Sequence, residues 1–117
     1  MHTFKDLKIW QKSMEISKDI FKITSEFPET EKYGLTSQMR RSSVSLPSNI
    51  AEGAGRNSNK EFIRFLEIAY ASSYELETQL ILAESFAYIN NETLEILEDK
   101  IVVVQKMIFN FIKHLKS

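Results

Sequence analysis

Two long segments in the second half of the chain carry a hydrophobic repeat that alternates steps of three and four residues without a slip. After Ser58 the repeat reads Phe62, Leu66, Ala69, Ser73, Leu76, Leu80, Ala83 and Ala87, and after Asn91 it reads Leu94, Leu97, Ile101, Val104, Ile108, Phe111 and Leu115. A period near 3.5 on long helices joined by short loops is typical of antiparallel neighbours that cross at about 20°. The repeat therefore predicts an all-α bundle.

The first half of the chain supplies two further predicted helices. The first runs from about Phe4 to Phe27 and ends there because the residue before Pro28 avoids helical angles. The second begins near Thr36, which we interpret as its N-cap, and its apolar seam is Leu35, Met39, Ser42, Leu46 and Ile50. Together the four helices predict an antiparallel up-down-up-down four-helix bundle that spans residues 1–117 as a single domain.

Pro47 lies inside the second predicted helix. A proline removes one backbone hydrogen bond, and its ring clashes with the carbonyl oxygen four residues earlier, here that of Ser43. The helix therefore either breaks at Pro47 or continues with a kink. We favour the kink, because the apolar seam keeps its phase on both sides of the proline.

The remaining helix ends have their own sequence signals. Gly53-Ala54-Gly55 is expected to end the second helix. Ser58, followed three residues later by Glu61, forms a capping-box pattern that opens the third helix. Asn90 and Asn91 are expected to make a turn and to cap the fourth helix.

Composition excludes several classes of function. The 117 residues carry a formal net charge of −1, so any attraction to nucleic acid must come from a local patch. The absence of cysteine excludes disulfides, thiol catalysis and thiolate metal sites. The N-terminal residues lack a signal-peptide pattern, and no apolar run approaches the length of a membrane span. We therefore expect a soluble, cytoplasmic protein with no membrane partner.

The sequence also gives no support for an enzyme. A carboxylate-bridged metal site in a bundle needs Glu-x-x-His on two helices, and neither His2 nor His114 has a glutamate three residues before it. No serine has a plausible base and orienting acid. We expect no metal, no cofactor and no catalytic residue.

The second predicted helix carries a polar stripe. Its members are spaced by four, four, three and four residues, so they share one helix face: Arg41, Ser45, Asn49, Glu52 and Arg56. Within this stripe, Asn49 and Glu52 are expected to face Lys60 and Arg64 at the start of the third helix. They would either clasp the corner between the two helices or meet a partner.

Several motifs together resemble one known family across nearly the whole chain. They are Phe4-x-x-Leu7-x-x-Trp10-Gln11, Phe27-Pro28-x-x-Glu31-x-Tyr33-Gly34-Leu35-Thr36-x-Gln38-x-Arg40-Arg41, Ser45-x-Pro47-Ser48-Asn49-Ile50-Ala51-Glu52-Gly53 and Ala69-x-x-Ser72-x-x-Glu75-Leu76-Glu77-Thr78. This pattern resembles the bacterial four-helix-bundle proteins encoded in intervening sequences of 23S rRNA genes. The resemblance implies an up-down-up-down bundle. It also implies kinship with the accessory variability determinant of diversity-generating retroelements, a barrel-shaped homopentamer that binds nucleic acid and a reverse transcriptase.

Basic side chains provide the candidate nucleic-acid surface. The first group lies around the second and third helices: Arg40, Arg41, Arg56, Lys60 and Arg64. A second group is Lys106 with the tail Lys113–Lys116. Arginine suits phosphate contact, and Gly53-x-Gly55-Arg56 before the Ser58 cap could form an anion site rather than a simple turn.

A structural interpretation competes for Arg40 and Arg41. Counting equal distances from the loop between the second and third helices places Arg41 level with Ala71 to Glu75. Glu75 or Glu77 could then form an ion pair with one of the two arginines and set the register of the bundle.

The third and fourth helices carry more apolar residues than one seam needs. The excess could widen the buried stripe of each helix, or it could bury against another subunit. The candidate interface residues are Tyr70, Tyr74, Ile81, Val103 and Met107.

Two hypotheses for the function follow. The first is a non-enzymatic scaffold, homopentameric by resemblance, with weak or partner-assisted RNA binding. The second is a protein–protein adaptor with no nucleic-acid role, which the near-neutral charge favours.

Overall fold

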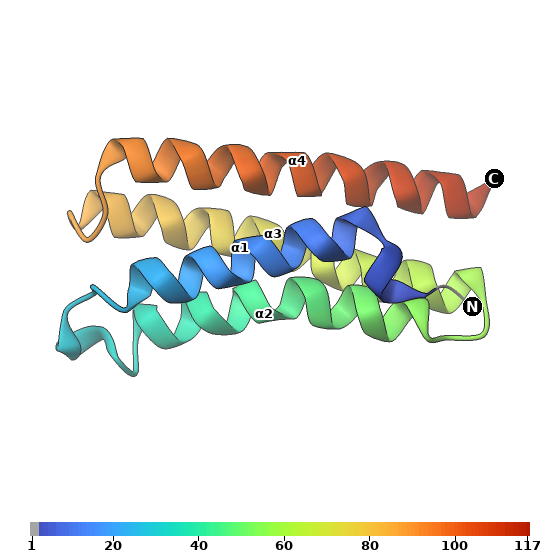
Figure 1. Cartoon of the computed structure of the whole chain (residues 1–117), viewed down its shortest axis with the longest axis horizontal. Helices are drawn as coiled ribbons and strands as arrows, with labels where there is room; N and C mark the ends of the chain where they lie inside the picture. Colours follow the sequence, from blue (N-terminus) through green and yellow to red (C-terminus); the bar gives the residue numbers. More distant parts are fainter. Residues whose placement is uncertain (1–2) are drawn as a thin grey trace.

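The computed structural model describes residues 3–117 and shows four long helices that run alternately up and down (Figure 1). They are α1 (Lys8–Thr24), α2 (Leu35–Ala54), α3 (Asn59–Ser85) and α4 (Asn91–Lys116), with short 3-10 helices at Phe4–Asp6 and Glu29–Glu31. No strand occurs in this part of the chain. The bundle measures 44 × 24 × 20 Å. The predicted all-α four-helix architecture is confirmed.

The core lies where the four apolar seams meet along the bundle axis. The largest fully buried side chains come from every helix: Ile16, Ile20, Met39, Leu46, Ile50, Phe62, Leu66, Leu76, Leu80, Ile101, Val104 and Ile108. Phe111 is partly buried and packs against this cluster. The seams of α3 and α4 are confirmed at every position except Ala87.

Ala87 lies outside the helix because α3 ends at Ser85. Its backbone has a φ of 63°, a left-handed conformation that ends helices. The amide of Tyr88 donates to the carbonyl of Ala83 and that of Ala87 to the carbonyl of Glu84, both at 2.9 Å. This hydrogen-bond pattern turns the chain toward α4 and leaves Ala87 exposed, so its predicted place in the seam is wrong.

The start of α2 also differs from the prediction. Gly34 is the N-cap, and Thr36 lies buried inside the first turn. The free amide of Leu35 donates instead to the Glu31 carboxylate at 3.0 Å. Glu31 reaches the helix end from the preceding loop, so a residue outside the helix supplies the acceptor that Thr36 was expected to supply.

The first helix is shorter than the sequence pattern indicates. Leu7 is extended, with a ψ of 126°, and separates the 3-10 turn at Phe4–Asp6 from α1. At its other end α1 stops at Thr24, and Phe27 is a buried loop residue. The apolar spacing continues beyond the helix because the flanking residues also pack on the core.

The remaining caps form as predicted. The Ser58 hydroxyl accepts from the Glu61 amide at 3.2 Å, and the Asn90 side chain accepts from the Thr93 amide at 2.8 Å. The Glu61 carboxylate turns to Arg64, at 3.6 Å, so only the serine half of the capping box is present.

α2 continues through Pro47, as the unbroken phase of its seam predicts. A carbonyl four residues before a proline loses its helical donor. Here that carbonyl belongs to Ser43, and it accepts instead from the buried Ser17 hydroxyl of α1 at 2.8 Å. The hydrogen bond that proline removes within α2 is thus replaced by one between two helices.

Candidate interaction surfaces

Arg40 is directed toward α1 and not toward α3. Its Nε donates to the Thr24 hydroxyl at 2.8 Å, and its Nη2 donates to the Phe21 carbonyl at 3.3 Å. The guanidinium carbon also lies 4.7 Å from the centroid of the Phe21 ring. A cation on the last carbonyls of a helix is favourable, so Arg40 ties α2 to the C-terminal end of α1.

The predicted ion pair between a helix-two arginine and Glu75 or Glu77 does not form among residues 3–117. Ser42 donates to Gln79 at 2.6 Å, which places Arg41 beyond Glu75 along α3 rather than level with Ala71 to Glu75. Counting from the loop failed because the two helices do not pack at equal distances from it. Arg41 and Glu75 are both exposed.

Glu77 has partners on α4. Its carboxylate accepts from Gln105 Nε2 at 3.0 Å. A hydrogen bond with Glu77, together with partial burial, raises the pKa of Glu98. Glu77 therefore helps to set the contact between α3 and α4.

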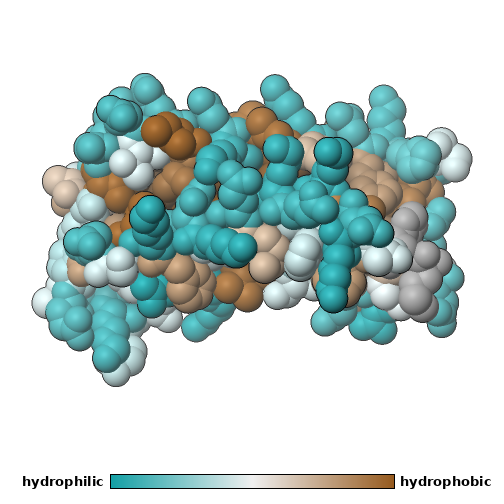
Figure 2. Space-filling model, in the orientation of Figure 1, coloured by the Kyte–Doolittle hydropathy of each residue, from teal (hydrophilic) through white to brown (hydrophobic). Residues whose placement is uncertain are grey.

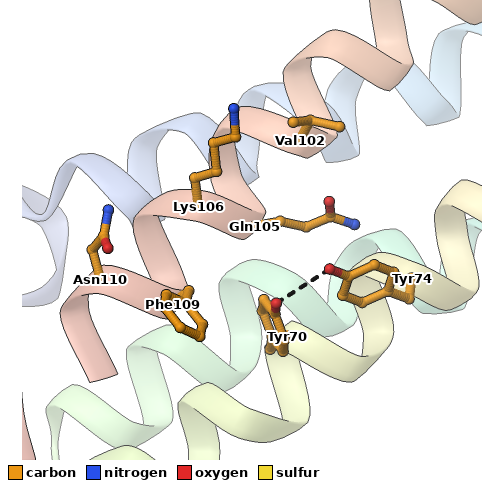
Figure 3. A pocket seen from close by; sticks show the side chains of 7 residues that line it. All are labelled: Tyr70, Tyr74, Val102, Gln105, Lys106, Phe109 and Asn110. Carbon is orange, nitrogen blue, oxygen red and sulfur yellow. Dashed lines mark hydrogen bonds between the residues drawn. The ribbon is translucent and has the colours of Figure 1, made fainter. Parts of the chain in front are cut away.

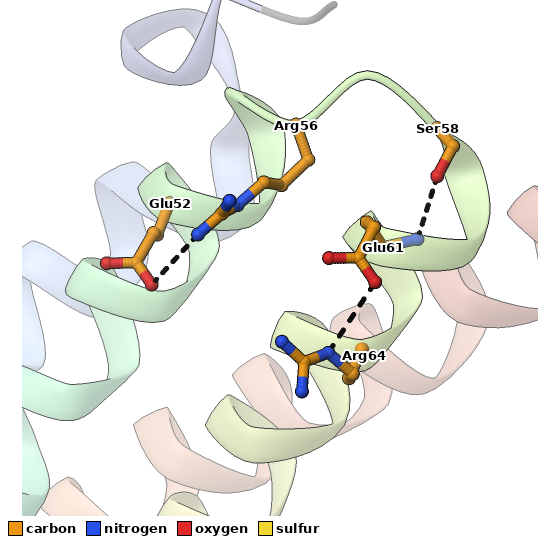
Figure 4. A network of polar contacts seen from close by, with 5 residues as sticks. All are labelled: Glu52, Arg56, Ser58, Glu61 and Arg64. Atoms are coloured by element: carbon orange, nitrogen blue, oxygen red, sulfur yellow. Dashed lines mark hydrogen bonds and ion pairs between the residues drawn. The ribbon is translucent and has the colours of Figure 1, made fainter.

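The corner between α2 and α3 joins two arginines and one aromatic ring, and Figure 4 shows the arginines beside Glu52 and Glu61. Arg56 pairs with Glu52 at 3.8 Å, and Arg64 with Glu61 at 3.6 Å. Their guanidinium carbons lie 4.8 and 5.3 Å from the centroid of the Phe65 ring. Glu52 thus pairs with a residue just beyond the end of its own helix, and not with Arg64 or Lys60 as expected. Each arginine charge at this corner has a carboxylate beside it.

The Ser45–Asn49 part of the polar stripe joins α2 to α3. The Asn49 amide donates to the carbonyl and to the hydroxyl of Ser45, at 2.8 and 2.9 Å. The Ser45 hydroxyl lies 2.9 Å from that of Ser72 on α3. All three residues are half-buried. The Ser45–Ser72 contact therefore joins the two helices, and the bonds of Asn49 hold Ser45 from within α2.

The five candidate interface residues fall on three different surfaces. Tyr70 and Tyr74 line a groove of about 370 Å³ between α3 and α4 (Figure 3). Val103 and Met107 border hollows between α4 and α1. Figure 2 shows apolar patches within a largely hydrophilic surface. Ile81 is 44% exposed on α3.

A second heptad stripe runs along the outside of α3. Its members are all exposed and spaced by steps of three and four: Ile68, Ala71, Glu75, Thr78, Leu82 and Ser85. Exposed helix faces are normally rich in charge, yet this stripe contains one charged residue. Its spacing is visible in the sequence, but the buried seam of the same helix has larger apolar residues and gives the stronger signal.

Lys100 forms a contact that the sequence pattern does not predict. Its ammonium lies 2.7 Å from the Asp19 carboxylate and 3.0 Å from that of Glu15, and so links α4 to α1. The hydrogen bond with Asp19, followed by that with Glu15, raises the pKa of Lys100, and Lys100 lowers the pKa of Glu15. Sequence separation hides this pair, since Asp19 and Lys100 are 81 positions apart.

Neither a metal centre nor a membrane span occurs within residues 3–117. In that range, no group of three or more His, Cys, Asp or Glu side chains is placed to hold a metal ion. None of the helices there is both long enough and apolar enough to cross a bilayer. His2, considered above as a metal ligand, lies outside the described residues.

Comparisons with known proteins agree with the fold. The family model described as "23S rRNA-intervening sequence protein" matches residues 5–110. A crystal structure from Bacteroides thetaiotaomicron, a protein of unknown function from the S23 ribosomal protein family, is similar with a TM-score of 0.81 and 28% identity. The similarity covers 90% of this chain and 98% of that one. No curated protein matches the chain. Because the family model covers most of the chain, this protein belongs to the 23S rRNA-intervening sequence protein family.

Proposed function

We propose that this protein is a non-enzymatic scaffold that assembles with further copies of itself through the outer face of α2 and α3. The observation that carries the proposal is the outer heptad stripe of α3. Ile68 and Leu82 in this stripe are 43% and 42% exposed, and Val44 on α2 is 42% exposed. A heptad stripe with small residues between large ones matches the way that helices pack side by side.

Unpaired charges on the same face support a second copy as the partner. Arg41 and Glu75 lie on the exposed sides of adjacent helices, and neither forms an ion pair within residues 3–117. Opposite charges on adjacent helices can pair across a contact between copies, where Arg41 of one protomer meets Glu75 of the next. The ion pair expected from the sequence would then form between chains.

Charge reversal tests this pairing. Arg41→Glu and Glu75→Arg should each reduce the mass of the assembly measured by multi-angle light scattering, because like charges would then face each other. The double variant Arg41→Glu/Glu75→Arg should restore the mass. Lys18→Glu, a reversal on the exposed face of α1, is the matched control and should change nothing.

Other results would overturn the proposal. A monomer at every concentration would reject self-association. An assembly unaffected by either single reversal would reject this face. The number of subunits is a separate prediction: the family resemblance implies five, and native mass spectrometry measures the number directly.

Weak RNA binding is a second candidate function, and the position of the unpaired cations favours it. Lys106, Lys113 and Lys116 are exposed on α4, and within the described residues none of them pairs with a carboxylate. This distribution supports a candidate RNA surface on α4, since Arg40, Arg56 and Arg64 have partners within the bundle. Anisotropy of a labelled RNA hairpin should fall sharply between about 50 mM and 200 mM salt if these lysines contact phosphates. No binding at the lower salt would reject the RNA role and favour a protein–protein adaptor.

A further inference from the structure

The groove between α3 and α4 has an aromatic wall and a polar edge (Figure 3). The rings of Tyr70 and Phe109 lie 6.4 Å apart at an interplanar angle of 41°, and the Tyr74 ring is 5.2 Å from that of Tyr70. Phe109 is 56% exposed and Tyr74 48% exposed. The volume of about 370 Å³ lies in the range of small-ligand sites, roughly 300–1,000 Å³.

Gln105 presents a fixed hydrogen-bond acceptor at this groove. It is 6% exposed, and its Nε2 donates to the Glu77 carboxylate at 3.0 Å. Because the Gln105 nitrogen is the donor in this bond, it faces Glu77. The Gln105 carbonyl oxygen is then left to accept from a ligand. The same bond holds the amide in one orientation before any ligand arrives.

Donors lie beside this acceptor. The Tyr70 and Tyr74 hydroxyls are 3.2 Å apart and share one hydrogen bond, which leaves the second hydroxyl hydrogen free to donate. The Asn110 amide, which both donates and accepts, lines the groove as well.

A positive charge borders the same groove. Lys106 belongs to its lining, with its ammonium directed away from the aromatic rings (Figure 3), and Lys113 follows two helical turns later on α4. Neither has a carboxylate partner within residues 3–117. A ligand with an aromatic ring, donors and acceptors on the ring edge, and an attached anion would satisfy all of these groups together.

We propose that the α3–α4 groove binds an unpaired nucleotide of single-stranded RNA. The base stacks against Phe109 and Tyr70, Gln105 and Asn110 bond its edge, and Lys106 contacts the phosphate. Stacking on aromatic side chains with hydrogen bonds to the base edge is the usual way in which proteins hold unstacked bases. This inference rests on the proposed RNA role and assigns it a site.

The test uses the full chain and a fluorescein-labelled oligouridine, with affinity measured by anisotropy at low salt. Phe109→Leu should weaken binding by about tenfold, because one stacking contact is lost. Phe86→Leu removes another exposed aromatic ring at the far end of α3 and is the matched control, expected to bind like the unaltered protein. Circular dichroism of both variants checks that the helices are retained.

The experiment distinguishes a wrong binding site from a wrong RNA role. If Phe109→Leu binds RNA as tightly as the unaltered protein does, the groove is not the binding site, although the RNA role stands. If no RNA binds at all, the RNA role is rejected. Titration with adenosine monophosphate then tests whether the groove binds a nucleotide. Shifts of the Gln105 and Asn110 side-chain amide resonances would support a nucleotide site, and unchanged resonances would reject it. Shifts caused by protein concentration alone would show that a second copy occupies the groove and would overturn the proposal.

Discussion

At the scale of single residues, Pro47 and Ser17 form a compensating pair. The proline withdraws the donor that the Ser43 carbonyl would have within α2, and the Ser17 hydroxyl of α1 replaces it at 2.8 Å. Ser43 is completely buried, and Ser17 is 8% exposed. Water therefore has little access to this carbonyl, and the serine is needed only because the proline is present.

Ser17→Ala should lower the free energy of unfolding by about 1–3 kcal/mol, because it leaves a buried carbonyl without a donor. Chemical denaturation measures the change. In a Pro47→Ala background the alanine amide can donate to Ser43, so the same substitution should cost much less. An equal cost in both backgrounds would show that Ser17 does not compensate for the proline.

At the scale of helices, the ends and crossings depend on single backbone positions. Ala87 ends α3 with a φ of 63°, which costs a residue with a Cβ about 1 kcal/mol. Gly53 lies where α2 and α3 approach closely at their common corner. A Cβ added to Gly53 would lie 2.8 Å from Phe65 Cβ and 2.9 Å from Phe62 Cδ1.

Ala87→Gly should raise the free energy of unfolding by about 1 kcal/mol, because glycine adopts the left-handed conformation without strain. Thermal denaturation at fixed protein concentration measures the increase. Ala71→Gly, in the middle of α3, should have the opposite effect, since glycine disfavours a helix interior. A loss of stability in both variants would contradict the strain assigned to Ala87.

Gly53→Ala should lower the free energy of unfolding by about 1–3 kcal/mol, because the methyl group must displace Phe62 or Phe65 from a packed corner. Gly55→Ala is the control, since the atom nearest to its added Cβ would be a backbone oxygen at 3.6 Å and its φ is −82°. That variant should be neutral or slightly stabilising. Equal losses in both would show that helix propensity, and not close packing, decides the result.

At the scale of the whole molecule, Glu31 connects both loops at one end of the bundle. Its carboxylate accepts from the Leu35 amide at 3.0 Å and from the Tyr88 hydroxyl at 2.7 Å. The first bond, then the second, lowers the pKa of Glu31 below its usual 4.5, and the same contact raises the pKa of Tyr88. One carboxylate thus joins the start of α2 to the connection between α3 and α4.

This contact predicts how stability depends on pH. Because the pKa of Glu31 is lower in the folded state, the unfolded chain binds more protons as the medium becomes acidic. The stabilisation is therefore present above pH 4.5, the ordinary pKa, and is lost as pH falls through the lowered pKa of the folded protein. Glu31→Gln should be less stable than the unaltered protein at neutral pH, and the difference should shrink on acidification. Denaturation curves at several pH values measure it, and a constant difference would exclude ionisation of Glu31 as the cause.

Hydrophobic spacing alone determined much of this protein. The seams of α3 and α4 predicted antiparallel helices, and the seam of α2 predicted that the helix continues through Pro47. The Ser58 and Asn90 caps were also predictable. These features depend on residues a few positions apart, whose relation is fixed by the geometry of one helix.

Contacts between distant segments were decided only by the tertiary structure. Three such contacts depend on how the helices are rotated and shifted against each other. They are the contact of Arg40 with α1, the missing ion pair with Glu75 or Glu77, and the link from Lys100 to Asp19. A heptad pattern fixes which face is buried, but the shift along the axis is set by close packing at points such as Gly53 and Ser45. The groove between α3 and α4 likewise exists only once Gln105, held by Glu77, is placed beside Tyr70 and Phe109.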